Sequence, residues 1–207
     1  MASAATSGSA QDSKTITLKR PVSEAAIAEQ DAGLQISVPD GWTAELKQPE
    51  TAANTQKTIL LQRFKTKNGL SVPVYLLSGG GDEVRKSVNN WTGQFTDGAQ
   101  EKTEETRSAI IPPQKRYVFV DVSGNFKGAS EPLLNHNGSV ENGRLLGAII
   151  GVPDSGIYVI SIVGPKDKVD AEYAAFRSSF GALAEESEND IDLSQDPETA
   201  GTEKTGN

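Results

Sequence analysis

The feature that most constrains the fold is an apolar segment at residues 157–163, which reads IYVISIV. Alternate residues of a strand point to opposite faces of a sheet, so a strand that is apolar on both faces is buried on both. This pattern predicts a central strand. At seven residues the segment is far shorter than the roughly 18 apolar residues of a membrane-spanning helix, and it is the longest apolar run in the chain.

Other segments have the pattern of half-buried strands. Leu34, Ile36 and Val38 alternate with polar residues, and Pro39 to Gly41 then predicts a turn. Pro73 has no amide hydrogen, which places it at a sheet edge or a strand start. Seven strands are predicted, at residues 34–38, 58–64, 70–77, 106–111, 116–122, 145–152 and 157–163, and residues 43–47 are a further candidate for a short return strand.

Two later segments have the period of amphipathic helices. The first follows Gly81, with Asp82 suited to its N-cap. Its apolar stripe is Val84, Val88, Trp91 and Phe95. The second starts at Asp167, and its stripe is Val169, Tyr173, Phe176, Phe180 and Leu183. Strands in blocks joined by short turns predict an α+β fold, in which an antiparallel sheet of about six to seven strands is covered by two main helices.

Charge divides the chain unevenly. Residues 185–207 hold eight acids and one lysine, a net charge of −7, while the whole chain carries −8. We therefore predict a flexible segment at 1–32 with a short helix at 23–30, one domain at 33–184, and a disordered acidic tail at 185–207. A nearly neutral domain with an acidic tail argues against binding to nucleic acids or to anionic membranes.

The three glycines at 79–81 raise the question of a phosphate-binding loop. A P-loop requires a lysine and a hydroxyl residue after its last glycine, but Asp82 and Glu83 stand there. Two acids would repel a phosphate. We interpret the glycines as a turn between a strand and a helix.

Catalytic and metal-binding patterns are not found. The chain has no cysteine, and His136 is its single histidine, which predicts that it holds no metal and no cofactor. Asp121 and Glu172 lie among apolar neighbours, but no second carboxylate can be placed beside either. We therefore predict that the protein is not an enzyme, with a carboxylate-based enzyme as the least favoured alternative.

Five sequence blocks resemble, in order, those of an uncharacterised bacterial family with a PsbP-like fold. The blocks are GLQISVPDGW (33–42), GGGDEVRKSVNNWTGQF (79–95), VDVSGNFKG (120–128), RLLGAIIGV (144–152) and YVISIVGPKDKVDAEYAAF (158–176). The resemblance implies a PsbP/Mog-like α-β-α sandwich. Many members of that family are exported or are predicted lipoproteins, and well-known members of the fold bind protein partners.

The resulting hypothesis is an extracytoplasmic, protein-binding or accessory domain whose partner is unknown. Residues 124–143 form a long predicted loop, which we expect to bind the partner. The candidate residues are Phe126, Pro132, Asn135, His136, Asn137 and, if exposed, Trp42. A cytoplasmic location is the alternative, and a lipid anchor would require a cysteine upstream of Met1. The second hypothesis is a carrier of a small apolar ligand in a cavity lined by Trp91, Phe95, Phe176 and Phe180.

Overall fold

The computed structural model describes residues 14–19, 33–46, 50–51, 58–77, 81–98, 100–111, 115–128 and 138–191. The predicted helix at 23–30 lies outside these residues. The main elements, in chain order, are β1 (Lys14–Leu18), β2 (Leu34–Val38), β3 (Thr43–Ala44), β4 (Glu50–Thr51), β5 (Thr58–Lys65), β6 (Ser71–Leu77), α1 (Gly81–Gly93), β7 (Phe95–Thr96), β8 (Thr103–Ile111), β9 (Lys115–Phe126), β10 (Val140–Val152), β11 (Gly156–Pro165), α2 (Lys166–Ser179), the 3₁₀ turn η1 (Glu185–Ser187) and β12 (Asn189–Asp190).

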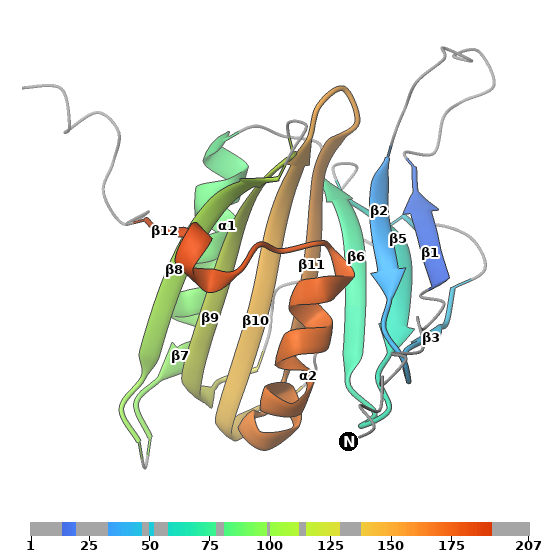
Figure 1. The fold of residues 1–207 in the computed structure, drawn as a ribbon. Helices are drawn as coiled ribbons and strands as arrows, with labels where there is room; N and C mark the ends of the chain where they lie inside the picture. The colour runs from blue at the N-terminus through green and yellow to red at the C-terminus, as the bar shows by residue number, and fades with distance from the viewer. Residues whose placement is uncertain are drawn as a thin grey trace, which may run out of the picture.

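A single large antiparallel sheet forms the centre of the molecule (Figure 1). Its strand order is β12-β8-β9-β10-β11-β6-β5-β3, with β4 also paired to β5 and β7 to β9. β11 lies between β10 and β6, which confirms the central position predicted for residues 157–163. The antiparallel sheet with two helices confirms the α+β prediction.

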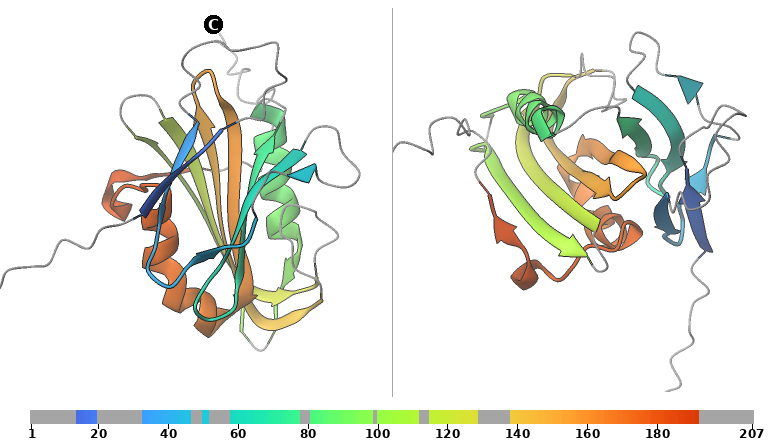
Figure 2. Two further views of the ribbon diagram at one scale, coloured as in Figure 1. Left: turned by 90° about the vertical axis from the view of Figure 1, so that its right-hand side faces the viewer. Right: turned by 90° about the horizontal axis from the view of Figure 1, so that it is seen from above.

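The two helices lie on opposite faces of this sheet (Figure 2). On one face, Val169 and Phe176 of α2 and Phe180, just after its end, join a core that also contains Leu34 and Ile36 of β2. On the other face, the apolar stripe of α1 packs into a second core. Alternate residues of β9, β10 and β11 point into the two cores, so the sheet lies between the cores and contributes side chains to both.

The stripe predicted for the first helix is confirmed for Val84, Val88 and Trp91, but Phe95 lies beyond the end of α1, in β7. Val88, Trp91 and Phe95 are buried in the core of that face, and Val84 packs at its margin. The helix begins at Gly81, so Asp82 lies in its first turn and not at the N-cap position. There it and Glu83 face the positive end of the helix dipole.

The folded part begins before residue 33, the start of the domain predicted from the sequence. β1 pairs with β2 over five residues, and Leu18 is buried in the α2-side core. The alternation of KTITL marks this strand, but it is a short pattern in polar surroundings. The Gly33 amide also donates to the buried hydroxyl oxygen of Ser155 (3.1 Å), which ties the β1–β2 pair to the turn after β10.

The C-terminal end of the fold also differs from the prediction. Residues 185–191 belong to the predicted disordered tail, yet η1 and β12 form there, and β12 pairs with β8. Composition alone hides this, because the acids in this segment have specific cationic partners, described below. The predictions for residues 1–13 and 192–207 fall outside the described residues.

Candidate functional site

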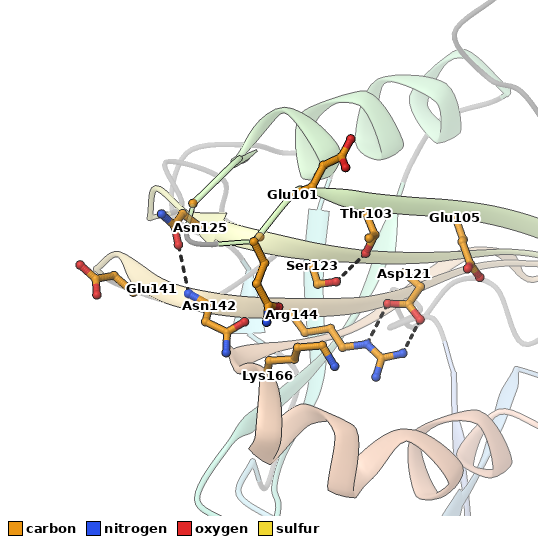
Figure 3. Close-up of a pocket in the computed structure, with 13 residues that line it drawn as sticks. Glu101, Thr103, Glu105, Asp121, Ser123, Asn125, Glu141, Asn142, Arg144 and Lys166 are labelled. Carbon is orange, nitrogen blue, oxygen red and sulfur yellow. Dashed lines mark hydrogen bonds and ion pairs between the residues drawn. The ribbon is translucent and has the colours of Figure 1, made fainter.

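A groove of about 650 Å³ lies beside the start of α2 (Figure 3). Strands β8, β9 and β10 form its base, and the first residue of α2 closes one side. Its lining is almost entirely polar and comprises Gly98, Gln100, Glu101, Thr103, Glu105, Asp121, Ser123, Gly124, Asn125, Glu141, Asn142, Arg144 and Lys166.

A bidentate ion pair forms the floor of this groove. Arg144 of β10 donates from Nε to Oδ1 of Asp121 (2.8 Å) and from Nη2 to Oδ2 (2.5 Å). The two residues are close neighbours because Leu146 of β10 is in register with Asp121 of β9. Hydrogen bonding to Asp121 raises the pKa of Arg144, with burial acting in the opposite direction. The guanidinium therefore stays charged and fixed in one orientation.

The same guanidinium extends the ion pair to α2. Its Nη1 donates to Oδ1 of Asp170 (2.5 Å), and Lys166 Nζ donates to Oδ2 of Asp170 (2.7 Å). The Arg144 guanidinium also lies over the Tyr173 ring, 5.0 Å from its centroid. Although desolvation raises the pKa of Asp170, hydrogen bonds from Lys166 and Arg144 outweigh it and lower the pKa overall. A general acid needs a raised carboxyl pKa, so Asp170 is unsuited to that role.

The rim of the groove is acidic. Glu101, Glu105 and Glu141 lie at the rim and, with Asp121 of the floor, give the groove lining four carboxylates against the two cations Arg144 and Lys166, a net charge of −2. The Glu105 side chain is 66% exposed, and its Oε2 lies 3.3 Å from Nη2 of Arg107. Because the cations of the floor are held by Asp121 and Asp170, the rim attracts positively charged groups.

The groove opens onto the outer edge of β8. Strand β12 covers only part of this edge, in the pairs Asn189↔Ser108 and Asp190↔Arg107. In the described part of the chain, no strand pairs with the outer side of Thr103, Glu104 and Glu105, which we call the open edge. Its position at the free border of the sheet is visible in Figure 1.

A buried charge cluster holds β12 in place. The Glu188 side chain is 0% exposed, and its carboxylate lies 3.3 Å from Nη1 of Arg107 and 3.0 Å from Nη2 of Arg177. The Tyr117 hydroxyl donates to Glu188 Oε1 (2.6 Å). Both arginines lie over the Phe119 ring, at 5.3 Å and 4.9 Å from its centroid. Burial, followed by the hydrogen bond to Glu188, raises the pKa of Tyr117 to about 12, so this donor keeps its proton.

Two of the candidate binding residues are buried. Trp42 is 7% exposed and donates from Nε1 to Oε2 of Glu172 (2.8 Å), so the condition of exposure set for it is not met. Phe126 is 1% exposed and packs on Phe95, because β9 extends to residue 126 and its side chain points into the α1-side core. Neither offers a surface to a partner. Pro132, Asn135, His136 and Asn137 lie outside the described residues.

The long predicted loop is shorter than residues 124–143. β9 continues to Phe126 and β10 begins at Val140, with Phe126 and Val140 in register. Polar and glycine residues hide these strand ends from a hydrophobic pattern. A register shift between Val140 and Gly143, with Asn142 at φ 48°, further breaks the alternation.

The cavity required for an apolar carrier does not exist between the four aromatic residues named for it. Trp91 and Phe95 belong to the α1-side core, whereas Phe176 and Phe180 belong to the α2-side core. All four are at most 3% exposed. The sheet separates the two pairs, so they cannot line one cavity.

The two carboxylates singled out in the sequence each have a structural partner. Asp121 is held by Arg144, and Glu172 accepts hydrogen bonds from Trp42 Nε1 and from Asn68 Nδ2 (3.1 Å). Glu105 is in register with Asp121 across β8 and β9, but Arg144 neutralises Asp121. Within the described ranges, no group of three or more metal-ligating side chains is present, and no helix is long and apolar enough to cross a membrane.

The sequence analysis missed the arginines of both clusters. Arg107, Arg144 and Arg177 occur singly, in segments assigned to strands or to a helix by their apolar residues. The buried or half-buried acids that hold them, Glu188 and Asp121, lie 11 to 81 positions away in the chain. No local spacing rule connects residues at such separations.

Comparisons with known proteins add an overall likeness. No family model matches the chain, and no curated protein matches it in sequence. Among solved structures, the chain is similar to cyanobacterial PsbP (CyanoP) from Synechocystis sp. PCC 6803, with a TM-score of 0.41 and 12% sequence identity. The match covers 92% of this chain and 99% of that one.

Proposed function

We propose that this protein is a non-catalytic accessory domain that binds a protein partner through the polar groove and the adjoining open edge of β8. The observation that supports the proposal is that the groove and the open edge lie side by side. A fixed ion pair forms the groove floor, and it is bordered by a strand edge that no other strand pairs with among the residues that the structure describes. Exposed strand edges bind peptide segments through main-chain hydrogen bonds, while neighbouring side chains select the sequence.

The state of the charged groups favours binding over catalysis. Arg144 is bonded to Asp121 and Asp170, and Lys166 to Asp170, so these side chains hold one another in fixed positions. Such a set orients a surface without supplying or accepting protons during a reaction. The rim acids Glu101, Glu105 and Glu141 are exposed to solvent, where they can meet a partner's charges, as polar residues at the rim of interfaces commonly do.

Photo-crosslinking in cells of the source organism tests this function. The photoreactive amino acid p-benzoylphenylalanine replaces Glu105 at the groove rim or, in the control variant, Lys86, which is exposed on α1 at the opposite face. We expect a defined protein to be crosslinked from position 105 and not from position 86. Equal capture from both positions, or none from position 105, would reject the proposal.

The proposal includes an extracytoplasmic location, periplasmic or membrane-anchored, with a cytoplasmic location as the alternative. Its support is the resemblance of five sequence blocks to a family with many exported members. Fractionation of source cells, with an antibody against residues 33–184, tests it. Recovery in the cytoplasmic fraction alone would reject the extracytoplasmic location.

A further inference from the structure

From the geometry of β8 and its charges, we infer that the partner contributes an extended, basic segment that adds to the open edge as a further β-strand. The inference rests on the proposed function and specifies the chemistry of the partner. Lysine or arginine side chains at alternate positions of that segment would point toward the groove, beside Glu105.

The backbone of the open edge is oriented for strand addition. The Ile191 amide donates to the Thr106 carbonyl (3.0 Å), so the Thr106 carbonyl points away from β9. In an antiparallel pair, the N–H and C=O of one residue point to the same side, and every second residue repeats that direction. The N–H and C=O of Glu104 therefore also point outward, toward the position of an added strand.

The side chains of the open edge are acidic on both faces of the sheet. Glu105 is in register with Asp121 on the groove face, and Glu104 is in register with Val122, which belongs to the α1-side core. Thr103, on the groove face, bonds its hydroxyl to that of Ser123 (2.6 Å). Glu104 pairs with Lys102 (3.0 Å) and Glu105 with Arg107 (3.3 Å), but the two carboxylates are 41% and 66% exposed. An added strand thus meets a solvent-exposed carboxylate on each of its faces.

These charges select against a second copy of the chain. If two open edges paired antiparallel with residue 104 opposite residue 104, Glu104 would face the same acid of the other copy, and like charges directly opposite one another destabilise a sheet. Charged residues on edge strands commonly prevent self-association in this way. A basic strand reverses the sign of the interaction.

The protein's own β12 shows which charges this edge accepts. Where β12 pairs with β8, Asp190 is in register with Arg107, an acid opposite a base. In sequence, the next acid is Asp192, and the same register would set it opposite Glu105. Continuing this pairing would therefore set two acids opposite one another, so the edge beside the groove suits a positively charged partner.

Titration of the full-length, ¹⁵N-labelled protein with synthetic peptides tests the inference. The probe is the capped heptapeptide TKTKVKT, and its matched control is TETEVET. We expect the lysine peptide to shift the amide resonances of Thr103–Thr106 and to bind at least roughly tenfold more tightly than the glutamate peptide. The affinity of the lysine peptide should fall in 0.5 M NaCl. Equal affinity for the two peptides would overturn the inference.

Two further variants separate charge from backbone pairing. Glu105→Lys should lower the affinity for the lysine peptide roughly tenfold and raise the affinity for the glutamate peptide, since it reverses the charge facing the groove. Glu104→Pro removes one outward N–H and should abolish binding, whereas Glu104→Thr, which keeps that N–H, should retain most of it. A lysine peptide N-methylated at each internal residue should not bind, which tests the main-chain bonds without altering the protein. Binding of that methylated peptide would refute strand addition.

The outcomes distinguish the inference from the function on which it rests. If position 105 crosslinks a partner in cells while the lysine peptide leaves residues 103–106 unshifted, the protein binds a partner but not by this chemistry. If position 105 captures nothing, the proposed function itself fails.

Discussion

At the scale of single residues, the fold depends on close approaches that only small or specifically paired side chains allow. Gly147 of β10 faces Trp91 of α1, and a methyl group at that glycine would overlap the indole ring. Glu188, near the C-terminal end of the described residues, is enclosed by Arg107, Arg177 and Tyr117. Each position tolerates little change, for a steric reason in one case and an electrostatic reason in the other.

Gly147→Ala should lower the free energy of unfolding by about 1–3 kcal/mol, because overfilling a packed core forces side chains or backbone to move. Gly151→Ala is the matched control on the same strand, since the nearest atom to its added methyl would be the Arg116 carbonyl oxygen at 3.9 Å. Urea unfolding of both variants measures the difference. Equal effects would show that Trp91 does not limit position 147.

Glu188→Gln should lower the free energy of unfolding by about 1–3 kcal/mol, because it leaves two nearly buried arginines without their shared carboxylate. Glu186→Gln, at an exposed position of η1, is the control and should change stability by less than about 0.5 kcal/mol. Urea unfolding again gives the values. A Glu188 variant as stable as the Glu186 variant would mean that the cluster contributes nothing net.

At the scale of elements, periodicity predicted the long strands and both helices, and failed at short strands and strand ends. The stripe of α1 and the both-sided burial of β11 were correct because each repeats over several residues. β1 and β12 are short, and the ends of β9 and β10 are rich in Ser, Gly and Asn, so their hydrophobic signal is weak. Pro73, predicted at a sheet edge or a strand start, is the third residue of β6, and the pairing of β6 with β11 begins at the next residue, Val74.

The attachment of residues 185–191 to β8 should weaken in acid. A hydrogen bond from Tyr173 and the charge of Arg107 lower the pKa of Glu185 below its ordinary 4.5. A lowered pKa in the folded state stabilises the fold at pH values above 4.5, and this contribution is lost as the pH falls through the lower, folded value. The protection of the Asn189 and Ile191 amides against hydrogen exchange, relative to their intrinsic exchange rates, should therefore fall below pH 4.5.

The control for this pH dependence is Glu185→Gln, which removes the titrating carboxyl. Its amides at residues 189 and 191 should show a smaller change in protection between pH 6 and pH 3 than those of the unmodified protein. Identical profiles would assign the acid sensitivity to other groups.

At the scale of the whole molecule, the central sheet couples the two cores. Tyr117 and Phe119 of β9 enter the α2-side core, while Val120 and Val122 of the same strand enter the α1-side core. Because the same strands supply both, neither core can be lost without disrupting the sheet. We therefore expect the two layers to unfold together.

The two tryptophans make this testable, since Trp42 lies in one core and Trp91 in the other. In Trp42→Phe and Trp91→Phe variants, the fluorescence of the remaining tryptophan and the far-ultraviolet circular dichroism should give coincident urea transitions. A fluorescence transition at lower urea than the dichroism in either variant would indicate that one layer unfolds separately.

The sequence by itself determined the class of the fold, its central strand and its two helix stripes, because hydrophobic periodicity is a local property that survives in any tertiary context. Only the tertiary structure decided the site. Asp121, Arg144 and Asp170 meet through strand register and helix placement, and Glu188 reaches Arg107 across 81 positions. The open edge of β8 likewise depends on where β12 stops. Charge pairing at such separations follows from the folded geometry, and no local pattern encodes it.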